Sequence, residues 1–102
     1  MFVALYRWRI RPGREGDFRA AWARMTELVR ERCASGGSAL FRDGDGTFVA
    51  IARWESREAW QRCFAEGPVD AVLSARMNDA VLERFPATEL ESLDDRWAPF
   101  PG

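Results

Sequence analysis

Two segments of this sequence, residues 2–10 and 47–54, are apolar on both faces when they are read as strands. Both are rich in aromatic and β-branched side chains, which is typical of strands, whose successive side chains point to opposite faces. One face carries the aromatic residues and the other the branched aliphatic residues: Phe2, Tyr6, Trp8, Phe48 and Trp54 against Val3, Leu5, Val49 and Ile51. A sheet built from these strands therefore needs a covering layer on both of its sides.

The other segments complete an alternating pattern of strands and helices. Apolar residues at helical spacing predict a helix over 16–33, and the Asp-Gly-Asp-Gly run at 43–46 is typical of a hairpin turn. The remaining predicted elements are a strand at 39–42, a short helix at 57–64 capped by Ser56, a helix from Pro68 to about Arg84 that Pro86 ends, and a strand at 88–93. The order β-α-β-β-α-β, with the second helix split, predicts an α+β, ferredoxin-like fold in which helices cover one face of a four-stranded antiparallel sheet.

Length and charge limit the domain organisation and the class of partner. A chain of 102 residues fits one domain, predicted over residues 1–97, with a short C-terminal tail at 98–102. A net charge of −1 argues against a nucleic-acid partner. RNA-recognition modules share the same element order, but the stretch 44–51 lacks the basic residue and the second aromatic residue that their third strand needs.

Histidine is absent from the chain. Its absence excludes histidine metal ligands, a haem held by an axial histidine, and catalytic dyads or triads built on imidazole, so no metal site is predicted. Cys33 and Cys63 form no Cys-x-x-Cys pair and are predicted to be free buried thiols in a reducing cytosol.

The N-terminal segment does not resemble a signal peptide, because Arg7 and Arg9 interrupt its apolar stretch. No uncharged apolar run approaches the ~18 residues that a membrane span requires. The sequence therefore predicts a cytoplasmic protein without a membrane partner.

The two-sided apolar strands also predict an assembly. Two helices can cover only one side of the sheet, and the uncovered side would expose a larger apolar patch than soluble monomers usually tolerate. At ~25 cal/mol per Å², covering several hundred Å² contributes on the order of 10 kcal/mol before the costs of association. We therefore expect a homodimer in which two sheets pack face to face.

Three stretches of the sequence resemble the antibiotic biosynthesis monooxygenase family: LYRWRIRPG at 5–13, Phe18 with Trp22, and DGTFVAIARWESREAW at 45–60. The resemblance covers roughly residues 2–97 and implies a dimeric α/β barrel with a pocket between sheet and helices. It also implies oxygenation of quinol-like substrates without metal or flavin, since relatives of this kind carry out that reaction, while another branch degrades haem. Family members often carry a histidine on the short helix, where this chain has Cys63. Because the chain has no histidine at all, the haem-degrading activity is not expected here.

Three candidate catalytic residues follow, each with a structural alternative. Trp54, at a strand end before a helix cap, can wall a pocket and offer its indole N–H, or it can simply fill the core. Arg76 is predicted on the apolar side of its helix, where it would hold an anion, pair with a carboxylate or extend to solvent. Tyr6 can bond a substrate hydroxyl or be satisfied in the core. Trp8, Trp60 and Phe64 are predicted to bind substrate, with core packing as the alternative.

Two functions remain open at this point. The first is a monooxygenase without cofactors that binds a small aromatic or quinol-like molecule and molecular oxygen, with a carboxylate or a water taking the proton. The second is a non-catalytic protein of the same fold that binds a small ligand. Cys63 is a poor candidate nucleophile, because no histidine or lysine is present to activate it.

Overall fold

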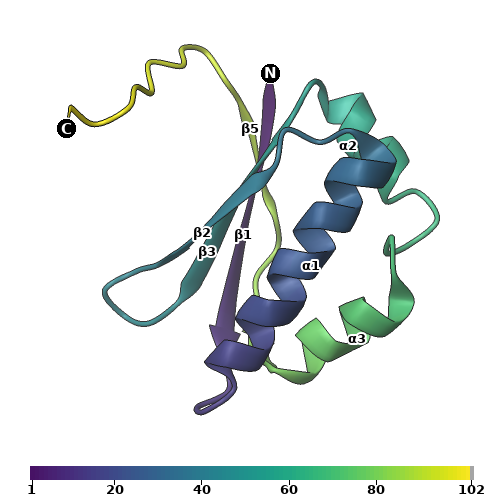
Figure 1. Ribbon diagram of the computed structural model, residues 1–102, viewed down its shortest axis with the longest axis vertical. Helices are drawn as coiled ribbons and strands as arrows, with labels where there is room; N and C mark the ends of the chain where they lie inside the picture. Colours follow the sequence, from purple (N-terminus) through teal and green to yellow (C-terminus); the bar gives the residue numbers. More distant parts are fainter. Residues whose placement is uncertain (102) are drawn as a thin grey trace.

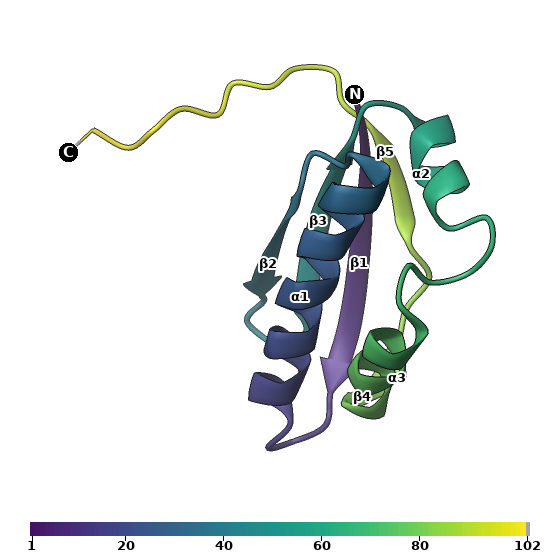
Figure 2. The same ribbon diagram turned by 45° about the vertical axis from the view of Figure 1, so that its right-hand side comes forward.

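A computed structural model gives the structure of residues 1–101; Gly102, the last residue of the predicted tail, lies outside the described residues. Helices and strands alternate along the chain as β1 (Phe2–Ile10), α1 (Glu15–Cys33), β2 (Ser38–Arg42), β3 (Phe48–Trp54), α2 (Arg57–Cys63), α3 (Ala71–Asp79), β4 (Val81–Arg84) and β5 (Thr88–Glu91). The strands form one antiparallel sheet, and the three helices lie together on one side of it (Figures 1 and 2). The predicted α+β, ferredoxin-like fold is confirmed.

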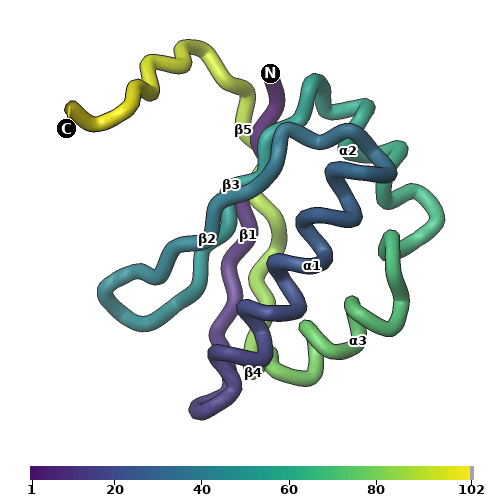
Figure 3. Tube along the Cα trace, viewed as in Figure 1, coloured from purple at the N-terminus to yellow at the C-terminus, as the bar shows by residue number. Residues whose placement is uncertain are grey.

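The sheet has the order β2-β3-β1-β4, and β5 also pairs with β1. β5 pairs with the first half of β1, from Phe2 to Leu5, and β4 pairs with its last residues, from Trp8 to Ile10. The tube in Figure 3 shows both segments following β1 in turn. The fourth strand of the predicted fold is therefore present as two short segments separated by residues 85–87, which include Pro86, a residue that cannot donate to a strand ladder.

The prediction of a helix from Pro68 to about Arg84 is wrong at both ends. α3 starts only after Asp70, whose Oδ1 accepts a hydrogen bond from the Leu73 N–H (2.9 Å), and it ends at Asp79. The following residues form β4 because the free edge of β1 offers them a strand partner, an interaction that sequence periodicity alone does not reveal. The short helix α2 begins as predicted, with Ser56 Oγ accepting from the Ala59 N–H (3.1 Å).

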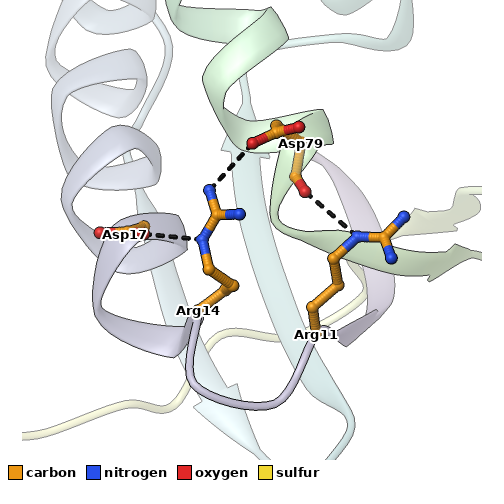
Figure 4. Close-up of polar contacts among 4 residues, drawn as sticks. All are labelled: Arg11, Arg14, Asp17 and Asp79. Carbon is orange, nitrogen blue, oxygen red and sulfur yellow. Dashed lines mark hydrogen bonds and ion pairs between the residues drawn. The ribbon is translucent and has the colours of Figure 1, made fainter.

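Arginine–aspartate contacts join the start of α1 to the end of α3 (Figure 4). Arg14 donates to Asp17 Oδ2 (2.7 Å) and to Asp79 Oδ2 (3.0 Å), while Arg11 Nε donates to the backbone oxygen of Asp79 (3.2 Å). The Arg11 N–H also donates to the backbone oxygen of Ala80 (2.9 Å). Such exposed pairs contribute little energy each. Together they hold the residue at which α3 gives way to β4.

The predicted free thiols are also wrong, because Cys33 and Cys63 form a disulfide. The bond joins the last residue of α1 to the last residue of α2. Residues thirty apart in sequence give no sign of proximity until the helices are placed on the sheet, so the pairing was not visible in the spacing. Its effect is to fix the end of α2, a helix without a fully buried residue, to α1.

The sheet has one covered and one open face. The covered face is the one that carries the aromatic side chains, and the core lies between these and α1. The opposite face of the sheet has no helix over it (Figures 1 and 2). We call it the open face, and the strand register places on it the apolar residues Val3, Leu5, Phe41, Val49, Ile51 and Leu90. Among residues 1–101, no helix has both the length and the apolar character needed to cross a membrane.

Candidate functional site

The covered face of the sheet has a hollow at one row of its ladder. The register pairs Phe2 with Trp54 and Trp8 with Phe48, so both ends of the β1–β3 pair carry large rings on this face. Between them, Ala4 pairs with Ala52, and two methyl groups fill far less space than two aromatic rings. The alternation of large and small side chains therefore leaves room at the Ala52 end of this row, and Ala52 lines the cavity described next.

A cavity of about 780 Å³ lies over this hollow, between the sheet and the helices. Its size lies within the range of small-molecule sites. Residues from all eight elements line it, and most of them are apolar. The apolar and aromatic lining includes Trp8, Trp22, Met25, Val29, Ala52, Trp54, Trp60, Phe64, Val69 and Met77.

Trp54 carries an unsatisfied donor at this cavity. Its side chain ends β3 and is only 2% exposed, with its ring against that of Phe64 (centroids 5.8 Å apart). Its Nε1 has no hydrogen-bond partner among residues 1–101. A buried N–H without a partner costs about 1–3 kcal/mol, and an acceptor atom of a bound ligand would remove that cost. Trp54 is thus a lining residue whose buried N–H has no acceptor within residues 1–101, and a ligand oxygen could reach it after a small shift of the indole ring.

Tyr6 and Trp60 form a second polar point on the wall. The Trp60 Nε1–H donates to the Tyr6 hydroxyl oxygen (2.8 Å), which leaves the hydroxyl proton of Tyr6 free to be donated elsewhere. Burial raises the pKa of Tyr6, and this effect outweighs the opposing effects of the Trp60 hydrogen bond and the Arg84 charge. Tyr6 is therefore a neutral hydrogen-bond donor at physiological pH and a poor base.

Charged groups lie where α2 and the two halves of the fourth strand meet the cavity. Arg57, the first residue of α2, donates to Glu89 of β5, and Arg84 of β4 also lines the cavity. Glu89 is the one carboxylate among the lining residues of the described chain. It lies in register with Ala4, so it projects from the covered face beside the hollow. Sequence analysis missed Glu89 and Arg57, because only the pairing of β5 with β1 brings them together.

Five of the six predicted site residues line the cavity: Tyr6, Trp8, Trp54, Trp60 and Phe64. Arg76 does not, and its predicted place on the apolar side of the helix is wrong, since its side chain is exposed. The prediction placed Val72 in the apolar stripe, but Val72 is 67% exposed. α3 instead packs through Leu73, Met77 and Ala80, which turns Ser74 toward the cavity and Arg76 away from it.

The family resemblance predicted from the sequence is confirmed by comparison. The family model described as antibiotic biosynthesis monooxygenase matches residues 1–69, which include β1, α1, β2, β3 and α2. The chain belongs to this family. No curated protein matches the sequence.

Solved structures share the fold at low sequence identity. Rv0793 from Mycobacterium tuberculosis is 22% identical, with a TM-score of 0.73 over 94% of this chain and 98% of its own. A Bordetella bronchiseptica protein is 18% identical, with a TM-score of 0.77 over 90% and 96% of the two chains. SnoaB from Streptomyces nogalater, a cofactor-independent oxygenase, is 16% identical, with a TM-score of 0.76 over 93% and 95%. At these identities the likeness shows the fold alone.

Proposed function

We propose that this protein is a cofactor-independent monooxygenase that acts on a small aromatic, quinol-like molecule in the cavity between sheet and helices. The observation that carries the proposal is the buried, unpartnered Nε1–H of Trp54 at an aromatic-lined cavity. A flat aromatic ligand fills such a site by stacking and apolar contact, and its oxygen atom satisfies the indole donor. Family membership and the fold shared with SnoaB support the same activity.

The proposed chemistry uses the substrate itself as the electron donor. Once a quinol-like hydroxyl loses its proton, the electron-rich anion reduces O₂; one oxygen atom enters the product as a carbonyl and the other leaves as water. The protein holds the ring, excludes water and stabilises the anion. Trp54 and Tyr6 donate to the substrate oxygens, while Trp8, Trp60 and Phe64 hold the ring.

Glu89 is the proposed proton acceptor, with Arg57 as its charge partner. When Glu89 takes the substrate proton, it becomes neutral, and Arg57 is left to face the new oxyanion. The site then holds one positive and one negative charge both before and after the transfer, so no unpaired charge is created. Arg57 and Arg84 provide the positive charge beside the anion, the role that the sequence analysis had expected of Arg76.

Oxygen uptake with a panel of hydroquinones and anthrone-like compounds tests the proposal. We expect Trp54→Phe to lower the rate by about 10- to 100-fold, because the ring remains and a hydrogen bond to a charged oxygen is lost. Glu89→Gln is expected to lower the rate by about 10²- to 10⁴-fold, the usual contribution of a general base. Glu83→Gln, on β4 and outside the cavity, is the matched control. Absence of oxygen uptake by the wild-type protein with every compound of the panel would refute the proposed oxygenase activity.

A non-catalytic ligand-binding protein is the second candidate. It is favoured by the ion pair between Glu89 and Arg57, since the carboxylate that would have to accept the substrate proton is already engaged by a cation. A compound that raises the melting temperature of the protein and is recovered unchanged after incubation in air would support this candidate over the enzyme.

The proposed assembly is a homodimer with the two open faces packed together. The open face holds six apolar side chains in neighbouring register rows, and Phe41 and Leu90 are 48% and 42% exposed on it. Such a contiguous patch is typical of an interface between subunits. Arg7 and Arg53 lie on the same face and give it a polar, positively charged border.

A further inference from the structure

The C-terminal arm, residues 92–101, extends away from the fold without forming a helix or strand. Two contacts hold its beginning: the Ser92 N–H donates to the Met1 carbonyl (2.9 Å), and Asp95 lies 3.7 Å from the Arg53 guanidinium. Figures 1 and 2 both show the arm running out on the side of the sheet opposite to the helices. It therefore leaves the molecule beside the open face, on which Arg53 also lies.

The arm carries large apolar side chains that its own chain does not cover. Leu93, Trp97 and Phe100 are 84%, 85% and 96% exposed. Complete burial of side chains of this size contributes roughly 1.5–3 kcal/mol each. Pro99 and Pro101 restrict the backbone on both sides of Phe100, so less conformational freedom is lost when this end of the arm becomes ordered. These are properties of a segment that binds a surface.

The geometry favours a second copy of this chain as the partner whose surface the arm binds. In a face-to-face dimer, an arm that leaves beside its own open face comes directly against the other subunit. Ten extended residues reach about 33 Å, and the described chain measures 38 × 36 × 26 Å, so the arm can cross most of a subunit. Asp94, exposed near the start of the arm, also complements the exposed Arg7 on the open face.

We propose that each C-terminal arm crosses to the other subunit of the homodimer and packs Trp97 and Phe100 against its surface. This proposal rests on the proposed homodimer. Because a dimer has twofold symmetry, the exchange is reciprocal: each arm packs on the other subunit, and the apolar side chains of both arms are buried.

Sedimentation measurements of the dimer dissociation constant test the contribution of the arm. We expect the double variant Trp97→Ser/Phe100→Ser to weaken the dimer by 10-fold or more without changing the circular dichroism of the fold. Val72→Ser is the matched control, since Val72 is also exposed but lies on α3, away from the open face. It should leave the dissociation constant unchanged.

A photo-crosslinking group at position 97 tests the crossing directly. Trp97→p-benzoylphenylalanine chains are mixed with wild-type chains that carry an isotope label, and the masses of the crosslinked products are measured by mass spectrometry. Crosslinks into labelled chains are expected. Crosslinks confined to the same chain, or an unaltered dissociation constant in the double variant, would overturn the crossing arm while leaving the dimer in place. A wild-type protein that is monomeric at micromolar concentration would overturn the dimer itself.

Discussion

At the scale of single residues, the site consists of hydrogen-bond donors in apolar surroundings. Trp54 offers an N–H that nothing among residues 1–101 accepts, and Tyr6 offers an O–H whose oxygen already accepts from Trp60. Glu89, the one carboxylate among the described lining residues, pairs with Arg57. A ligand that presents oxygen acceptors on a flat ring is complementary to this arrangement, whereas a ligand rich in donors would leave both residues unsatisfied.

Tyr6 is the only tyrosine of the chain, so its titration can be followed without interference from others. Burial raises its pKa above 10, and we expect the phenolate absorbance to appear at higher pH than in free tyrosine. Since the folded pKa exceeds the unfolded one, the stability that Tyr6 contributes is present below pH 10 and is lost as the pH rises through the folded pKa.

Ultraviolet titration of the native and the urea-unfolded protein measures this difference. In the variant Trp60→Phe, the hydrogen bond that lowers the pKa of Tyr6 is gone, and the titration should move to still higher pH. A native titration that coincides with the unfolded one would show that the Tyr6 hydroxyl is open to water.

Residue-level prediction from sequence succeeded where strand alternation decides which way a side chain faces. Tyr6, Trp8 and Trp54 line the cavity because each lies on the aromatic face read from the period of two. Arg76 was misplaced because the rotation of a short helix depends on what it packs against, and Val72 was an exposed member of the assumed apolar stripe. Glu89 could not be found, since its position depends on a strand pairing rather than on its neighbours in sequence.

At the scale of elements, α2 depends on its covalent link to α1. It carries Arg57, Trp60 and Gln61 to the cavity, yet none of its residues is buried. The Cys33–Cys63 disulfide therefore holds one wall of the cavity in place. The sequence predicted α2 and its Ser56 cap. It did not predict the disulfide, because the two cysteines form no Cys-x-x-Cys pair.

Reduction of the disulfide is expected to lower the free energy of unfolding by about 3–4 kcal/mol, the loop-closure contribution for a separation of 30 residues. Urea unfolding with and without a phosphine reductant measures the change. The double variant Cys33→Ser/Cys63→Ser should match the reduced protein and be insensitive to reductant. An unfolding curve of the wild type that reductant does not move would mean that the two sulfurs are not bonded in solution.

At the scale of the whole molecule, the two-sided apolar character of β1 and β3 is the feature from which we infer the proposed dimer. The sequence predicted both faces correctly, because register partners in a sheet share a face once the alternation is known. What the sequence did not show is that the fourth strand is divided.

Placing a charge at the centre of the open face should separate the proposed dimer. We expect Ile51→Asp to be monomeric by light scattering, because an unpaired carboxylate would be buried between two sheets. Phe41→Asp, at a more exposed position of the same face, gives the same test with little risk to the fold. Val72→Asp, on α3, should leave the mass unchanged. A wild-type mass of one chain at micromolar concentration would contradict the assembly.

The division of the fourth strand at Pro86 has a consequence for how molecules reach the interior. Arg84 and Glu89, which flank the break, both line the cavity, and only short ladders hold β4 and β5 to β1. Either half can detach at the expense of a few hydrogen bonds, while the long β1–β3 ladder stays intact. We therefore expect a ligand of the proposed site to exchange through this edge by brief local fraying of β4 or β5, while the β1–β3 ladder keeps its shape.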